Sequence, residues 1–119
     1  MAESYFEVNG EDFAEKVLDV EQMVVVSFTS SQSPACQIQE PEFDAVSKEY
    51  QGRVLFAKLD VDKNGDAVQQ WNIEGIPTII FFHHGAEIHR IKGILMRERL
   101  RKQIEGALLV TEDTTKSAK

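Results

Sequence analysis

Residues 23–37 read MVVVSFTSSQSPACQ, an apolar run that leads through a serine-rich turn into the sequence Ser33-Pro34-Ala35-Cys36. The run over residues 23–28 is rich in valine and short enough for a buried strand. Serine is a favourable helix N-cap, and proline suits the first helical position, so we predict a helix that begins at Pro34. The stretch therefore predicts a strand, a tight turn and a helix whose first turn holds Cys36.

Similar reasoning predicts the elements on either side of this turn. Asn9 is expected to cap a first helix that reaches about residue 20, and the chain allows a short first strand at residues 5–8. The predicted elements after the turn are the helix from Pro34, which Gly52 ends, a strand at 54–61, a short helix at 66–71, strands at 78–82 and 88–91 joined by a hairpin at Gly85, and a helix at 96–109. A strand-helix-strand unit implies parallel pairing, and a hairpin implies antiparallel pairing. We therefore predict one mixed α/β domain over residues 1–110, followed by a flexible tail at 111–119.

The composition narrows the classes of partner and compartment. The chain has 119 residues, 42% hydrophobic residues and a net charge of −7. This charge argues against nucleic acid or an anionic membrane as the main partner and favours neutral or basic partners. No stretch approaches the roughly 20 apolar residues of a membrane span, and the acidic N-terminus lacks the apolar run of a signal peptide. We expect a cytoplasmic protein, monomeric or weakly dimeric, without a cofactor or a bound metal.

Four features at this spacing resemble the thioredoxin family. They are VVVSF leading into an x-P-x-C turn, Pro41 within the helix that follows, the sequence AKLDVD, and GIPTIIFF followed by HHG and Gly93. The resemblance covers roughly residues 5–109. It implies a thioredoxin fold, which is a central mixed sheet of four to five strands flanked by helices. It also implies a cis peptide bond between Ile76 and Pro77.

The same resemblance brings out what this sequence lacks. The family's turn is W-C-G-P-C, and Ser33 stands where the first, nucleophilic cysteine is expected. A hydroxyl cannot form a disulfide, so a chain with one cysteine cannot carry out dithiol–disulfide exchange by itself. The family's buried acid aligns with Ser27, its tryptophan with Gln32, a second aromatic residue with Thr29 and a lysine with Gln37. We interpret this changed neighbourhood as a natural loss of activity, similar to that of chaperone-like thioredoxin-domain proteins with S-x-x-C in the turn.

Two functions remain open. The resemblance implies a groove in which an extended peptide or protein segment binds by strand-type hydrogen bonds, formed by Gln32, Ser33, Pro34, Ile76, Pro77, Gly93 and Ile94. In this reading the protein is a chaperone-like or adaptor module. The alternative is a monothiol redox protein in cell redox homeostasis, whose Cys36 forms a mixed disulfide with glutathione or a partner. The structural interpretation of the two turn residues is simpler: Ser33 is an N-cap, and Cys36 is a small buried hydrophobe.

Residues 60–66 read DVDKNGD and match the first half of a calcium-binding loop. The twelfth position of such a loop should be glutamate, but here it is Trp71. We therefore interpret this stretch as a strand end followed by a helix cap.

Overall fold

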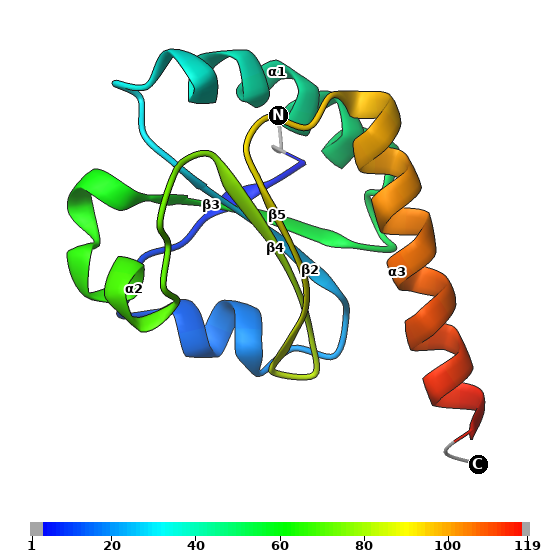
Figure 1. Cartoon of the computed structure of the whole chain (residues 1–119). Helices are drawn as coiled ribbons and strands as arrows, with labels where there is room; N and C mark the ends of the chain where they lie inside the picture. The colour runs from blue at the N-terminus through cyan, green and yellow to red at the C-terminus, as the bar shows by residue number, and fades with distance from the viewer. Residues whose placement is uncertain (1–3, 118–119) are drawn as a thin grey trace.

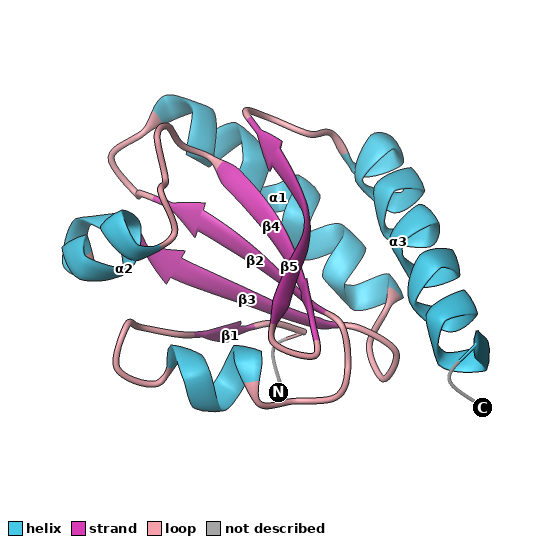
Figure 2. Cartoon of the chain, turned by 60° about the horizontal axis from the view of Figure 1, so that its bottom comes forward, coloured by secondary structure: helices cyan, strands magenta, loops and turns pink. Residues whose placement is uncertain are grey.

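A five-stranded mixed sheet forms the centre of the computed structural model, which describes residues 4–117 (Figure 2). The strands are β1 (Phe6–Glu7), β2 (Val24–Thr29), β3 (Leu55–Asp60), β4 (Thr78–His83) and β5 (Ala86–Lys92), arranged in the order β1-β3-β2-β4-β5. β3 pairs in parallel with β1 and β2, whereas β4 pairs antiparallel with β2 and β5. The predicted mixed sheet is therefore confirmed.

Helices cover both faces of this sheet (Figure 1). They are the π-helical turn η1 (Ala14–Leu18), α1 (Pro34–Glu49), the 3₁₀ turn η2 (Val61–Lys63), α2 (Gly65–Gln70) and α3 (Arg97–Ser117). α1 and α3 pack on one face, and η1 and α2 pack on the other. None of the described helices is both long and apolar enough to cross a membrane.

The central strand β2 contributes side chains to two hydrophobic cores, one on each face of the sheet. Val25 packs with Phe43 of α1 and Ile104 of α3, whereas Val24 and Val26 pack with the core on the opposite face. Because successive strand residues point to opposite faces and both faces are covered, an unbroken apolar run is needed here rather than an alternating one. This explains why the valine run at the start of the quoted stretch determines the middle of the fold.

The predicted helix ends differ from the observed ones in two places. The first helical segment begins with reciprocal bonds: the Asp12 N–H donates to Asn9 Oδ1 at 3.0 Å, and the Asn9 N–H donates to Asp12 Oδ1 at 2.8 Å. Its regular part, however, is only the π-type turn η1. At the other end, α3 continues to Ser117, through most of the segment predicted as a tail. Residues 118–119 lie outside the described part, and the flexibility of 111–119 stays a prediction.

Candidate functional site

The turn after β2 is built as the local sequence predicts. Ser33 has extended backbone angles (φ −94°, ψ 122°), and its Oγ accepts a hydrogen bond from the Cys36 N–H at 3.2 Å. Pro34 occupies the first turn of α1, where the missing N–H of proline costs nothing. Ser33 is thus an N-cap, and its hydroxyl is engaged with the helix backbone.

Cys36 is a buried, free thiol. Only 2% of the residue is exposed to solvent. Its backbone N–H is used by the cap, and no hydrogen bond to its sulfur is found among the described residues. This burial agrees with the interpretation of Cys36 as a small hydrophobe, and it leaves the thiol shielded from large partners.

The loop before β4 brings two of the predicted groove residues together. The Ile76–Pro77 peptide bond is cis, as the resemblance implied. Pro77 is buried, and its carbonyl oxygen accepts a hydrogen bond from the Gly93 N–H at 2.8 Å. Gly93 has a φ of 91°, a left-handed conformation that favours glycine. The strand pair Thr78–Lys92 extends this contact into the β4–β5 ladder.

A buried glutamine fixes the segment that follows Gly93. The Gln39 side chain of α1, 1% exposed, donates to the Leu95 carbonyl at 2.9 Å and accepts from the Leu95 N–H at 2.6 Å. Leu95 is itself buried, whereas its neighbours Ile94 and Met96 are 40% and 49% exposed. We call these two hydrogen bonds between Gln39 and Leu95 the clamp. The clamp holds the side chains of Ile94 and Met96 at the surface beside α1.

Ile38, which precedes Gln39 on α1, is a further exposed apolar side chain. Ile38 has the helical spacing of one apolar face together with Phe43, Val46 and Tyr50, which predicts that it is buried, but the structure leaves it 51% exposed and buries Gln39 instead. That expectation was wrong because spacing alone cannot show that a polar side chain will be paired with a loop backbone. We call Ile38, Ile94 and Met96 the apolar rim. Of these three, only Ile94 was predicted as a site residue.

Lys58 of β3 takes an unusual, buried position. It lies beside Ser27 in the β2–β3 register and is 8% exposed. Its Nζ lies 2.9 Å from Glu40 Oε2, 2.8 Å from Asp44 Oδ1 and 3.8 Å from the centre of the Tyr5 ring. Burial alone would lower the pKa of Lys58, but hydrogen bonds to Asp44 and Glu40 outweigh it and raise the pKa. The neighbouring residue on β2 is Ser27, which carries no charge. The positive charge of Lys58 is therefore balanced by Glu40 and Asp44 of α1.

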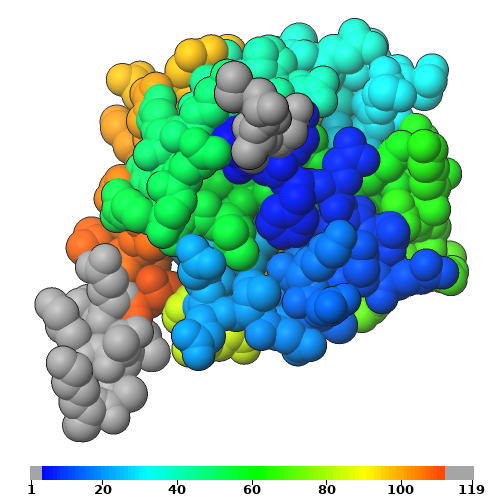
Figure 3. All heavy atoms as spheres, turned by 180° about the vertical axis from the view of Figure 1, so that it is seen from behind, coloured from blue at the N-terminus to red at the C-terminus, as the bar shows by residue number. Residues whose placement is uncertain are grey.

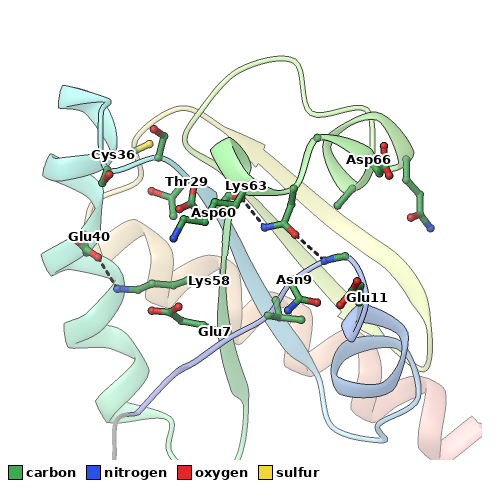
Figure 4. Close-up of a pocket in the computed structure, with 18 of the residues that line it drawn as sticks. Glu7, Asn9, Glu11, Thr29, Cys36, Glu40, Lys58, Asp60, Lys63 and Asp66 are labelled. Atoms are coloured by element: carbon green, nitrogen blue, oxygen red, sulfur yellow. Dashed lines mark hydrogen bonds and ion pairs between the residues drawn. The ribbon is translucent and has the colours of Figure 1, made fainter.

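A pocket of about 970 Å³ opens at the carboxyl ends of β1, β2 and β3. Figure 3 shows on one face of the molecule the segments that enclose it, the blue N-terminal stretch, the cyan start of α1 and the green segment after β3. Its charged lining residues are Glu7, Glu11, Glu40, Lys58, Asp60, Lys63 and Asp66, and the thiol residue Cys36 also lines it (Figure 4). None of the seven predicted groove residues lines this pocket. No sequence motif signalled the pocket, because its walls come from four separate segments.

The segment that resembles a calcium loop performs a structural task. Asp60 Oδ1 accepts from the Asp62 N–H at 2.9 Å and so caps η2. Asn64 donates to the Asp60 carbonyl at 2.8 Å and accepts from the Gly10 N–H at 3.0 Å (Figure 4). Within the described residues, no group of three or more histidine, cysteine, aspartate or glutamate side chains is arranged to hold a metal ion.

Comparisons with known proteins agree on one family. The family model described as Thioredoxin matches residues 4–106. A thioredoxin from Chlorobaculum thiosulfatiphilum is 30% identical over 104 residues, covering 87% of this chain and 96% of that protein. One from Synechocystis sp. is 31% identical over 99 residues, covering 83% and 92%. A probable thioredoxin-2 from Caenorhabditis elegans is 34% identical over 106 residues, covering 88% and 73%.

Proposed function

The chain belongs to the thioredoxin family, and from that premise we propose that it is a redox-inactive member that binds extended protein segments. Ser33 carries this proposal. Its hydroxyl caps α1 at the position where dithiol exchange needs the first thiol, and Cys36 is the only cysteine. Recognition of an extended peptide by backbone hydrogen bonds needs no thiol.

The surroundings of the turn support binding rather than chemistry. The groove would run from Gln32, Ser33 and Pro34, past Ile76 at the cis-proline loop, to Gly93 and Ile94. The other two residues of the apolar rim, Ile38 and Met96, would extend the groove with side chains that are 51% and 49% exposed. Exposed large hydrophobic side chains that gather near a binding loop are typical of interaction surfaces. The role would be that of a chaperone-like or adaptor protein, and we place it in the cytoplasm.

Peptide selection with matched variants tests the proposal. A displayed library of random peptides would be selected on the native chain, and the dissociation constant of an enriched peptide would then be measured. We expect Ile94→Asp to weaken binding at least tenfold, about 1.4 kcal/mol, because it places a charge in an apolar contact. Cys36→Ala should change the dissociation constant by no more than about twofold, because Cys36 is buried and is not one of the groove residues. A tenfold change would correspond to about 1.4 kcal/mol of binding free energy.

Ile88→Asp is the matched control. Ile88 is 38% exposed and lies on the edge strand β5, outside the proposed groove. Its substitution should leave peptide binding unchanged. The proposal fails if Ile94→Asp and Ile88→Asp behave alike, or if Cys36→Ala abolishes binding.

A further inference from the structure

The outer side of the edge strand β5 is open. The strand order ends at β5, and Figure 2 shows it as the outermost strand, with α3 beside it. In an antiparallel ladder, alternate residues direct both of their backbone polar groups away from the neighbouring strand. No strand within residues 4–117 pairs with those groups of β5. An extended segment of another chain can therefore form hydrogen bonds with them.

A bulge in β5 turns Ile88 toward α3. The β4–β5 register is regular up to the pair Phe81–His89. The next pair is Phe82–Glu87, so Ile88 has no partner on β4. Regular alternation would send the side chains of Ile88 and His89 to opposite faces of the sheet. Both nevertheless line the same groove beside α3, because a bulge redirects the residue that it inserts.

This groove, which lies between β5 and the middle of α3, is mainly apolar. We call it the β5–α3 groove, and its volume is about 250 Å³. Its apolar walls are Ile88, Ala107 and Val110, of which Ile88 is 38% and Val110 61% exposed. At Gly106 the floor is open, since an added Cβ would meet no surrounding atom within 4 Å. A strand added here would gain side-chain contacts as well as backbone hydrogen bonds.

Hydrogen-bond donors line the polar end of the β5–α3 groove. His89 Nε2 and Gln103 Oε1 lie 2.6 Å apart, a hydrogen bond that ties β5 to α3. The NH₂ group of Gln103 then has no acceptor in the described part of the chain. Lys102 is exposed and forms no ion pair with any described residue. These donors fit a backbone carbonyl and a carboxylate of a bound segment.

The local charge of the β5–α3 groove differs from that of the whole chain. The net charge of −7 favours neutral or basic partners. None of the residues that line this groove carries a carboxylate, however, and Lys102 supplies a positive charge. Charges act mainly within the Debye length, about 8 Å at physiological salt. A segment with one carboxylate therefore complements the groove better than a basic segment does.

We propose that the β5–α3 groove is a second docking surface, which binds an extended protein segment with apolar side chains and a carboxylate. The segment pairs with the outer edge of β5 as an added strand. Its apolar side chains pack on Ile88 and Val110, and its carboxylate accepts hydrogen bonds from Lys102. This surface shares no residue with the groove at the cis-proline loop, so neither proposal depends on the other.

Fluorescence anisotropy of short labelled peptides tests the proposal on the native chain. The peptides alternate threonine and valine, and one aspartate replaces a different threonine in each of them. The same set with lysine in place of aspartate is the charge control. A set with N-methylated backbone amides is the strand control, because it cannot donate the ladder hydrogen bonds. We expect at least one aspartate peptide to bind saturably, and its counterparts in both control sets to bind about tenfold more weakly.

Gly106 offers a matched pair of variants that keep the fold. Glutamate and lysine both form helices better than glycine, and an added Cβ has room at this position. Gly106→Glu and Gly106→Lys should therefore both unfold at no lower urea concentration than the native chain. They add side chains of similar length and opposite charge. The aspartate peptide should bind about tenfold more weakly to Gly106→Glu than to Gly106→Lys.

Two further variants separate the two docking surfaces. Ile88→Asp should weaken binding of the aspartate peptide about tenfold and leave the peptide selected for the cis-proline groove unaffected, whereas Ile94→Asp should do the reverse. The proposal is overturned if either control set binds as tightly, if the two Gly106 variants bind alike, or if no peptide binds below about 1 mM. Dimerisation of the native chain that Ile88→Asp abolishes would also overturn it, because a second copy would then occupy the β5–α3 groove.

Discussion

At the scale of single residues, Ser33 shows how one side chain can begin a helix close to the chain's single cysteine. Its Oγ accepts from the Cys36 N–H, one of the backbone donors that a helix start leaves unpaired. The local sequence predicted this cap because serine before proline is a common helix start. The Ser33 hydroxyl therefore holds the geometry of the turn through a hydrogen bond to the helix backbone.

The cap predicts a measurable loss of stability. Ser33→Ala should lower the free energy of unfolding by about 1 kcal/mol, because the Cys36 N–H loses its acceptor. Ser33→Asn should stay within a few tenths of a kcal/mol, since asparagine caps about as well as serine. Equilibrium denaturation in urea checks both variants. Equal stability of the alanine and asparagine variants would show that the hydroxyl contributes nothing to the helix.

At the scale of elements, the clamp between α1 and the segment before α3 depends on Gln39. Its amide makes two hydrogen bonds to the backbone of Leu95, in surroundings where both residues are buried. A buried backbone group that loses its partner costs about 1–3 kcal/mol. The clamp therefore fixes where Ile94 and Met96 lie relative to α1.

Gln39→Leu should lower the free energy of unfolding by about 2–4 kcal/mol, because the Leu95 N–H and carbonyl both lose their partners. It should also weaken peptide binding in the selection assay by loosening the apolar rim. Urea denaturation measures the first effect, and hydrogen exchange of the Leu95 amide should show faster local opening. Gln37→Leu, on the same helix but exposed, is the matched control. Unchanged exchange at Leu95 in the Gln39 variant would contradict the clamp.

The contrast between Ser33 and Gln39 shows what could be predicted from the sequence. Helix starts, the valine run of β2 and the hairpin at Gly85 depend on neighbours in the chain, and their signals are local. The exposure of Ile38 and the burial of Gln39 depend on a segment 56 positions away along the chain, which periodicity cannot detect. The acidic pocket likewise arises from four segments that meet only in the folded sheet, so no short motif could reveal it.

At the scale of the whole molecule, the layer of α1 and α3 is joined by a buried core and by polar pairs at its edge. Glu42 binds Arg97, and Glu49 binds Arg101. The Glu49–Arg101 pair is exposed, where such pairs contribute little, whereas the Glu42 side chain is only 13% exposed. Tyr50 differs because it is buried: its ring packs against Phe56, and its hydroxyl donates to Glu105 Oε2 at 2.6 Å. Of these three links, it is the one made by a buried side chain, although its partner Glu105 is 53% exposed.

This link predicts how stability falls at alkaline pH. Burial, followed by the hydrogen bond to Glu105, raises the pKa of Tyr50 from 10.0 to about 12. Because the folded state holds the phenolic proton more tightly than the unfolded state, the contribution is fully present below pH 10 and is lost as the pH rises through about 12. A rise of the pKa from 10.0 to about 12 corresponds to about 3 kcal/mol.

Tyr50→Phe should therefore be less stable than the native chain near neutral pH by about 1 kcal/mol, the worth of a hydrogen bond. Because the native chain loses more than this as Tyr50 ionises, the difference should close and then reverse in sign as the pH rises from 10.0 through about 12. The chain has only two tyrosines, so Tyr5→Phe leaves Tyr50 as the one phenol whose ultraviolet titration is observed. A phenol that titrates near 10 in the folded Tyr5→Phe variant would refute the buried link. A titration near 12, together with stability curves that cross in this range, would support the buried link from Tyr50 to α3.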